Sequence, residues 1–166
     1  GKLSGEIRIG GRNPVTTDIA ALADIVGTVF QNPRTQFFNT DTDSELVFGL
    51  ENRSIPRKQM KQRLRELTQD LHLEHLRERS IFALSGGEKQ KIAFSSVYAS
   101  DPEILVLDEP SSNLDVGAIE ELALLIAKAK KEGKTIVIAE HRLWYLMNLA
   151  DRVVFLRDGC WRKICP

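Results

Sequence analysis

The chain has 166 residues, of which 42% are hydrophobic and 28% are charged, and its 23 basic and 23 acidic side chains give a net charge of zero. This composition is typical of one soluble globular domain, or of the larger part of one, and the zero charge excludes a general attraction to nucleic acid or to a membrane surface. No apolar run approaches the ~20 residues that cross a bilayer, and the first residues do not resemble a signal peptide. The two cysteines, Cys160 and Cys165, are too few for a disulfide framework or a zinc site, so we expect free thiols in a reducing compartment.

The first 33 residues are expected to form a β element followed by a buried strand. Residues 5–11 alternate apolar and polar side chains before a glycine pair, which predicts a strand that enters a tight turn. A short helix is predicted over 18–24 and a buried strand over 25–30. That strand is expected to end at Pro33, because proline cannot donate to a sheet ladder.

Helical patterns dominate residues 34–99, which we expect to form a separate helical lobe. One short helix is predicted over 43–50, and Pro56 suits the first turn of the next. Apolar side chains then recur on one face, which predicts a core-facing stripe with a charged, solvated face around it. These are Met60, Leu64, Leu67 and Leu71. A further helix is predicted over 85–99.

Strand and helix patterns alternate in the last third of the chain. Strands are predicted over 103–107, 135–139 and 152–156, and helices over 115–132 and 142–149. Gly133 is the predicted stop of the first of these helices. The alternation predicts an α/β fold with a parallel sheet covered on both faces.

The stretch Leu84-Ser85-Gly86-Gly87-Glu88-Lys89-Gln90 has two interpretations. Ser85 and Glu88 form a capping box, so the simpler one is a helix start. The two glycines between them add no capping strength and cost stability inside a helix, but they leave backbone N–H groups open at the positive end of the helix dipole. A phosphate can approach there, and the serine hydroxyl adds a donor, so the stretch suits the γ-phosphate of ATP.

Two adjacent carboxylates, Asp108 and Glu109, follow an apolar run and precede Pro110. They have a plain interpretation as a strand-end cap or an ion pair. Ligands of open α/β sheets bind at the carboxyl ends of the strands, however, and this position fits phosphoryl transfer. Asp108 would then hold Mg²⁺ directly or through water, and Glu109 would orient or deprotonate the attacking water.

Two further candidates also follow predicted strands. A lone histidine is more often structural, but the position of His141 after the strand 135–139 favours contact with the γ-phosphate and the attacking water. Gln31 lies where a strand becomes a loop, and its neutral amide can reach the water shell of Mg²⁺ without adding charge. Loop glutamines are common, so this assignment depends on the other motifs.

Together these motifs resemble those of ATP-binding cassette (ABC) ATPases, in the family's order and with its approximate spacings. Gln31 resembles the Q-loop, 84–90 the signature motif, 105–109 the Walker B strand, 112–115 the D-loop and His141 the H-loop. The resemblance implies an α/β, P-loop NTPase-type three-layer core with a parallel sheet, a helical subdomain and part of an N-terminal antiparallel β element. A partial ABC ATPase domain over 1–166 would then divide into a β element and Q-loop strand (1–33), a helical subdomain with the signature helix (34–99) and an α/β core (100–166).

The resemblance also implies ATP and Mg²⁺ as cofactors, with two such domains meeting head to tail around each ATP. The signature residues would serve the partner's ATP, and the residues at the strand ends would serve the ATP of this domain. The implied site has Glu109 and His141 as catalytic residues, Asp108 and Gln31 as metal ligands, and Ser85, Gly86, Gly87, Glu88, Gln31 and Asp115 as ATP-binding residues.

Within the family, the segments 29–33, 36–38 and 48–52 and the step 140–142 resemble ATPases of energy-coupling factor (ECF) transporters, which import vitamins or metal ions such as cobalt and nickel. This implies an ATPase that powers import, lies in the cytoplasm against the inner face of the cell membrane, and binds transmembrane subunits but no nucleic acid. A partner domain that lends only its signature motif and a soluble non-transport ABC ATPase remain alternatives. The short interval between Gln31 and Ser85 leaves no room for the long coiled coils of DNA-repair members.

The sequence departs from the family at three points. No phosphate-cradling Gly-x-x-x-x-Gly-Lys-Ser/Thr occurs, although this Walker A loop normally lies upstream of a segment like residues 4–7. We therefore expect a fragment that hydrolyses ATP negligibly by itself. Lys91 stands where arginine is usual, which keeps the charge and loses bidentate geometry, and Asn113 stands where a small D-loop residue is common.

Overall fold

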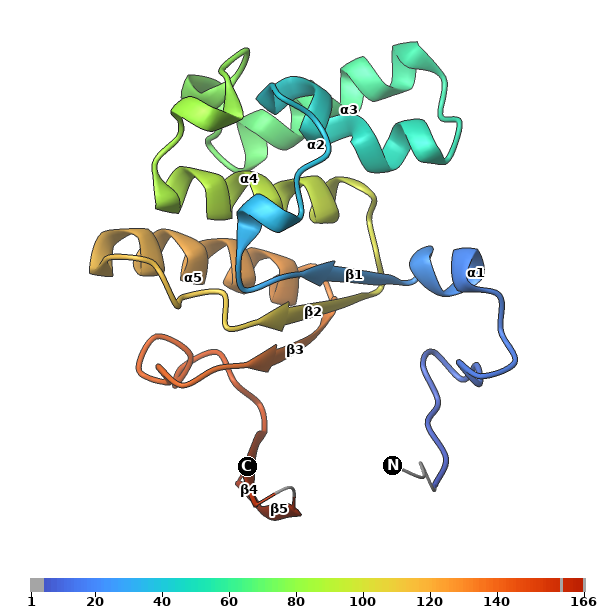
Figure 1. Ribbon diagram of the computed structural model, residues 1–166, viewed down its shortest axis with the longest axis vertical. Coiled ribbons are helices and arrows are strands. Elements are labelled where there is room, and N and C mark those ends of the chain that lie inside the picture. The colour runs from blue at the N-terminus through green and yellow to red at the C-terminus, as the bar shows by residue number, and fades with distance from the viewer. Residues whose placement is uncertain (1–4, 159, 166) are drawn as a thin grey trace.

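Three parallel strands form the central sheet of the computed structural model, which describes residues 5–158 and 160–165 (Figure 1). They are β1 (Val26–Val29), β2 (Ile104–Asp108) and β3 (Thr135–Ala139), in the order β1-β2-β3. Val29 pairs with Leu107, and Leu107 with Ile138, so the carboxyl ends of all three strands meet at one edge. The three strands predicted around these positions are confirmed.

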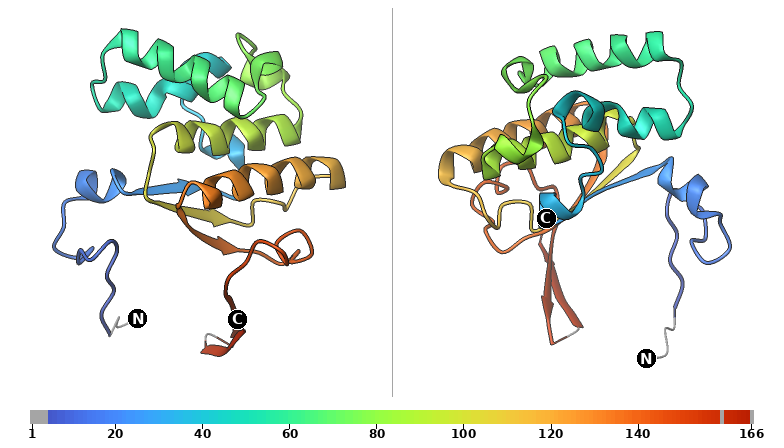
Figure 2. Two further views of the ribbon diagram at one scale, coloured as in Figure 1. Left: turned by 180° about the vertical axis from the view of Figure 1, so that it is seen from behind. Right: turned by 45° about the horizontal axis from the view of Figure 1, so that its top comes forward.

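Two helices, α4 (Gly86–Ala99) and α5 (Val116–Lys131), pack on the same face of this sheet, as the views from two sides agree (Figure 2). On that face Leu105 and Leu107 are fully buried, and they share one apolar core with Phe94 and Leu122. Alternate residues of the strands point the other way. On that second face Val137 is 54% exposed, and the described residues place no helix over it.

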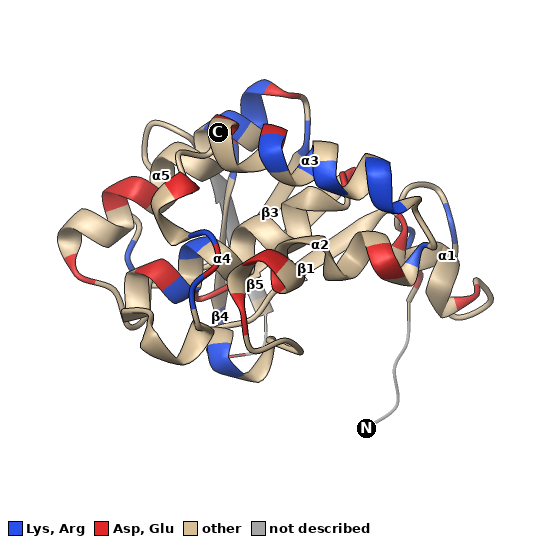
Figure 3. Cartoon of the chain, turned by 90° about the horizontal axis from the view of Figure 1, so that it is seen from above, with Lys and Arg blue, Asp and Glu red and all other residues tan. Residues whose placement is uncertain are grey.

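The helical region lies beyond α4 and contains α2 (Thr42–Asn52) and α3 (Arg57–Asp70). Asp41 begins α2 by accepting from the Ser44 N–H at 2.9 Å. Three of the four residues predicted for the apolar stripe of α3 are buried, and Met60 is half-buried. The opposite side of α3 carries exposed lysines and arginines, as predicted for a solvated face (Figure 3). Short 3₁₀ turns follow at Glu74–Leu76 and Ile81–Ala83.

Two predictions about secondary structure and one about strand pairing are wrong. Residues 5–11 form no strand: an isolated antiparallel bridge joins Ile9 to Arg12 around Gly10 and Gly11, whose positive φ angles of 54° and 76° make the tight turn. Residues 142–149 form turns instead of a helix. The strand predicted over 152–156 exists as β4 (Val153–Arg157), but it pairs antiparallel with β5 (Cys160–Cys165) and stays outside the parallel sheet.

The remaining elements are short. The predicted helix before β1 is confirmed as α1 (Ile19–Ala23), and a 3₁₀ turn over Pro33–Thr35 follows β1. Cys160 is a free, exposed thiol, whereas the side chain of Cys165 and the first four residues lie outside the description. In the part of the chain that the structure covers, none of the helices combines the length and apolarity that crossing a bilayer requires.

Candidate functional site

Each strand of the parallel sheet is followed at its carboxyl end by one of the predicted site residues. Gln31 comes after β1, Glu109 after β2 and His141 after β3. The Gln31 side-chain amide donates to Glu109 Oε2 at 2.9 Å, and His141 Nε2 lies 3.2 Å from Glu109 Oε1. The fold therefore converts three distant sequence positions into one cluster, with the Glu109 carboxylate held from both sides.

The backbone of Glu109 is fixed as firmly as its side chain. Its φ angle is +40°, in the left-handed region that costs a non-glycine residue about 1 kcal/mol or more. Two hydrogen bonds maintain this conformation: the Glu109 N–H donates to the Ala139 carbonyl at 2.8 Å, and the Glu109 carbonyl accepts from the Ser112 N–H at 3.1 Å. This local turn lifts the carboxylate off the end of β2 and toward its two partners.

Exposure differs among the three acidic and basic groups at this edge. The Glu109 side chain is 31% exposed, whereas the His141 side chain is 86% exposed. Asp108 is the last residue of β2 and is also exposed. A ligand that approaches the edge therefore meets the imidazole and the Asp108 carboxylate directly, with Glu109 behind them.

The predicted signature motif begins α4 with a complete capping box. Ser85 Oγ accepts from the Glu88 N–H at 3.2 Å, and Glu88 Oε2 accepts from the Ser85 N–H at 2.7 Å. The second Glu88 oxygen accepts from Arg79 at 2.9 Å. The hydrogen bond from the Ser85 backbone lowers the pKa of Glu88, with help from the Ser85 hydroxyl and Arg79, although partial burial opposes it. Both carboxylate oxygens of Glu88 thus hold the start of the helix.

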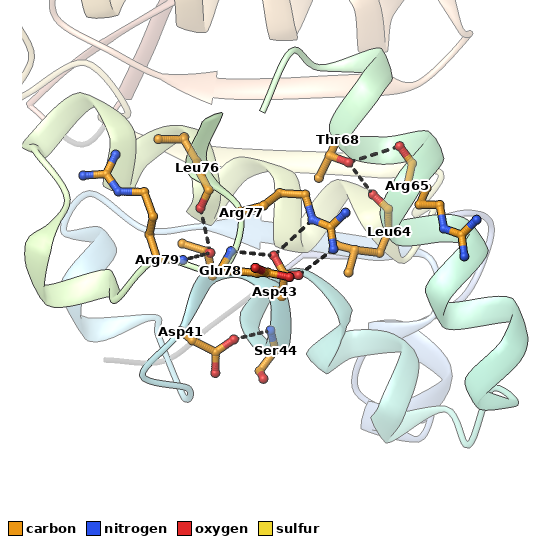
Figure 4. Close-up of polar contacts among 11 residues, drawn as sticks. Asp41, Asp43, Ser44, Leu64, Arg65, Thr68, Leu76, Arg77, Glu78 and Arg79 are labelled. Carbon is orange, nitrogen blue, oxygen red and sulfur yellow. Dashed lines mark hydrogen bonds and ion pairs between the residues drawn. The ribbon is translucent and has the colours of Figure 1, made fainter. Parts of the chain in front are cut away.

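Arg79, which pairs with Glu88 of this cap, belongs to a loop that lies against the first turn of α2 (Figure 4). Its backbone N–H donates to Thr42 Oγ1 at 3.2 Å, and the Thr42 hydroxyl donates to the Leu76 carbonyl at 2.7 Å. Next to it, Arg77 and Asp43 form an ion pair at 2.7 Å. The loop that carries Arg79 is therefore fastened to the first turn of α2, and through Glu88 it fastens the signature helix.

The two glycines of the motif have different surroundings. A Cβ at Gly86 would lie 3.6 Å from the Asn113 carbonyl, an ordinary contact. A Cβ at Gly87 would lie 2.8 Å from the Ala118 Cβ of α5. Gly86 therefore leaves backbone open near the D-loop, while Gly87 lets α4 and α5 approach closely, a packing role that the sequence pattern did not show.

The predicted D-loop leads from β2 to α5 and passes close to the start of the signature helix α4. Asp115 is the N-cap of α5, and its carboxylate accepts from the Ala118 N–H at 2.8 Å. A cavity of about 390 Å³ lies beside this loop, and its lining includes Gln31, Gly86 and Asn113. The Q-loop, the signature helix and the D-loop thus share one cavity.

A family model described as ABC transporter matches residues 2–112. The chain belongs to the ABC transporter family. A Treponema denticola protein that carries the name of an ABC transporter ATP-binding protein is 66% identical over 159 residues, which are 96% of this chain and 32% of that protein. A Pyrococcus horikoshii protein named for the same role is 36% identical over 93% of the chain and 60% of its own length. This ABC domain therefore spans between about a third and three fifths of these two relatives.

Among solved structures, cbiO1 of Clostridium perfringens superposes with a TM-score of 0.87 at 29% identity, over 97% of this chain and 65% of that protein. That cbiO1 is described as part of the ABC transporter complex cbiONQ. The match confirms the α/β fold of a P-loop NTPase-type ABC domain and the resemblance to ECF-type ATPases.

The donor set at the sheet edge of this ABC domain fits Mg²⁺ that arrives with a nucleotide. Within the described residues no three or more His, Cys, Asp or Glu side chains are grouped as a metal cage. Mg²⁺ usually takes one or two protein oxygens and completes its shell with phosphates and waters. Asp108 and the Gln31 amide oxygen are groups of the kind that would supply such a partial set.

Two residues important to this geometry were missed by the sequence analysis. Arg79 has no periodic or motif signal, because its partner Glu88 is brought to it by the fold. Glu140 entered the sequence analysis only as part of the step 140–142. In the structure its carboxylate accepts from the N–H groups of both Ser111 and His141. Only its position next to His141 could have marked it.

Proposed function

We propose that this chain is the hydrolytic part of an ATPase that powers import through an ABC transporter of the ECF type. The observation that carries the proposal is the Glu109 carboxylate, held between the Gln31 amide and the His141 imidazole at the strand ends. A carboxylate fixed in this way can orient a water and accept its proton. The 166 residues contain no phosphate-cradling loop, so the activity is proposed for the full-length gene product.

In this proposal each group has a distinct task. Glu109 holds and deprotonates the attacking water. His141, on the solvent side of Glu109, holds the γ-phosphate that the water attacks. Asp108 with Gln31 would hold Mg²⁺, which supplies positive charge to the phosphates when ATP is bound. The Gln31 amide nitrogen contacts the Glu109 carboxylate, which leaves its amide oxygen as the group that would hold the cation.

The signature helix would serve the ATP of a second ABC domain. Ser85 Oγ accepts from the Glu88 N–H, so its own proton is available for donation to a phosphate. The glycines that follow keep the helix N-terminus open to an anion, with Gly86 exposed. The ion pair of Glu88 with Arg79 then acts by holding these donors in place.

The transmembrane partner is proposed to dock at a second cavity, of about 440 Å³, between β1 and α2. Phe38 and Phe48 stack there with ring centroids 4.7 Å apart, and Phe38 is 75% exposed. The lining also includes Phe30, which directly precedes Gln31. A partner seated here would contact the segment that leads into the site, at the inner face of the membrane.

Turnover of the full-length gene product tests the hydrolytic role. Glu109→Gln should lower kcat for ATP by about 100-fold or more while ATP binding is retained, because a general base contributes on that order. Glu103→Gln, the same change in an exposed residue at the other end of β2, is the matched control and should leave kcat unchanged. Equal turnover in the Glu109 variant and wild type would instead support a domain that lends only its signature motif.

Copurification tests the docking proposal. Phe38→Asp should abolish association with the membrane fraction and leave ATP binding intact. Phe82 is 78% exposed on the 3₁₀ turn Ile81–Ala83, so Phe82→Asp controls for a charge placed on an exposed aromatic. Loss of association in both variants would refute this location.

A further inference from the structure

Glu140 occupies the position between the end of β3 and His141, and its carboxylate accepts four hydrogen bonds. Oε1 accepts from the backbone N–H groups of His141 at 2.8 Å and Arg142 at 3.0 Å. Oε2 accepts from the Tyr145 hydroxyl at 2.8 Å and the Ser111 N–H at 3.3 Å. One side chain therefore joins the H-loop backbone to Ser111, which directly precedes the D-loop (112–115).

Arg142 makes a second link between the two loops, in which the side chain that follows His141 is the donor. The Arg142 guanidinium donates to the carbonyls of Ser111 at 3.4 Å and Leu114 at 3.2 Å. His141 thus lies between two residues that both bind the segment 111–114, which contains most of the D-loop. Tyr145 is buried in the main apolar core, so its hydroxyl ties the Glu140 carboxylate to the rigid part of the fold.

The His141 imidazole has little packing of its own. Its side chain is 86% exposed, so its position depends mainly on its backbone. Glu140 holds the His141 N–H and, through Ser111, the loop whose Ser112 N–H binds the Glu109 carbonyl. Both members of the Glu109–His141 pair are therefore anchored through the same carboxylate.

We propose that Glu140 is a positioning residue that fixes the H-loop against the D-loop and so keeps the His141 imidazole at the Glu109 carboxylate. The inference rests on the proposed ATPase function, because the pair that Glu140 positions is the hydrolytic one. Burial raises the pKa of Glu140, but the hydrogen bonds it accepts outweigh burial and leave the pKa below its usual value. A carboxylate that stays ionised keeps all four acceptor sites.

The conservative variant separates this role from general support of the fold. In Glu140→Gln the amide oxygen can still accept from His141 and Arg142, but the NH₂ group then meets the Ser111 N–H, donor against donor. The link to the D-loop is lost while the side-chain volume is kept. Glu140→Ala removes all four bonds.

Steady-state kinetics of the full-length gene product provide the test. Glu140→Gln should lower kcat by about tenfold, the worth of one charge-assisted hydrogen bond, and leave KM for ATP within about twofold. In a His141→Ala background the same change should lower kcat by less than about twofold, because Glu140 acts through His141. Independent, multiplicative losses in the double variant would overturn the proposal.

A second tyrosine–glutamate pair serves as the structural control. The Tyr98 hydroxyl donates to Glu132, and Tyr98 is as buried as Tyr145. Tyr145→Phe should lower kcat, whereas Tyr98→Phe should leave it within about twofold, although both lose one hydroxyl–carboxylate bond. Equal effects of Tyr145→Phe and Tyr98→Phe on kcat would show that Glu140 supports the fold only and does not position His141.

Amide hydrogen exchange separates failure of this inference from failure of the proposed function. If the wild-type gene product hydrolyses no ATP, the hydrolytic role fails. Hydrogen exchange then still tests whether Glu140 positions the H-loop. The amides of Ser111, His141 and Arg142 should exchange about tenfold faster in Glu140→Ala, with β3 amides unchanged. Unchanged exchange at Ser111 and His141 would overturn the positioning role.

Discussion

Gly87 lies so close to Ala118 that a Cβ at position 87 would be 2.8 Å from the Ala118 Cβ. The contact sets the distance between the signature helix and the helix that follows the D-loop. The glycine that a sequence pattern assigns to phosphate access is thus also required for helix packing.

This contact predicts opposite effects for the two adjacent glycines. Gly87→Ala should lower the free energy of unfolding by about 1–3 kcal/mol, because overpacking between α4 and α5 exceeds the gain in helix propensity. Gly86→Ala meets only an ordinary contact and should leave stability unchanged or raise it by up to about 1 kcal/mol. Urea denaturation of both variants checks this, and equal stability of the two would contradict the packing role.

The loop that carries Arg79 depends on Asp43. The Asp43 carboxylate accepts from Arg77 at 2.7 Å and from the Glu78 N–H at 3.1 Å. Asp43→Ala should therefore cost about 1–3 kcal/mol of unfolding free energy, because a partly buried guanidinium and a backbone N–H lose their acceptor. Asp70→Ala on the exposed side of α3 is the control, and thermal unfolding should show little change for it.

Stability should fall in acid because two carboxylates have lowered pKa values. The pKa values of Glu88 and Glu140 both lie below the ordinary value of 4.5 in the folded chain. A group of this kind contributes stability above its unfolded pKa and loses it as the pH falls through its folded pKa. The free energy of unfolding should therefore decrease below about pH 4.5. Glu88→Gln should flatten that decrease, and an unchanged slope in urea titrations at several pH values would be the contrary result.

The contact between Gln31 and Glu109 requires a hydrogen-bond donor at position 31. Gln31→Glu would place a second carboxylate at a 2.9 Å contact, and like charges at that distance do not ionise together easily. The acid limb of the pH–rate profile for ATP hydrolysis should therefore move to higher pH, by about one unit or more. Gln31→Met keeps the size without charge and should lower kcat with no such shift, which distinguishes repulsion from the loss of a hydrogen bond.

Local patterns predicted most of the fold, because the signals that begin or bury these elements lie within the elements themselves. The capping box at Ser85, the helix predicted over 115–132 and the apolar run of β2 each have their signals within one segment, and all three are confirmed. The prediction of a helix over 142–149 is wrong although apolar residues are frequent in this segment. Only Tyr145 and Leu146 are buried there, so no continuous stripe supports a helix. The N–H groups of Leu146 and Leu149 instead donate to the carbonyls three residues earlier, which closes four-residue turns.

Long-range pairing was the part that local patterns could not supply. The alternation over 152–156 predicts a strand but not its partner, and β4 pairs with the segment that immediately follows it. For the site, strand ends predicted that Gln31, Glu109 and His141 meet, which the structure shows. The contacts of Arg79 and Glu140 depend on the spacing between separate loops, which no single segment specifies.

The left-handed backbone of Glu109 has an evolutionary consequence. At φ +40° the position suits glycine or asparagine better than glutamate, so the chain gives up stability there to keep a carboxylate. Selection for thermal resistance alone should therefore enrich Glu109→Gly and Glu109→Asn, and the survivors should be robust proteins that turn over no nucleotide. In a natural population, by contrast, the glutamate would persist only as long as the organism depends on that turnover.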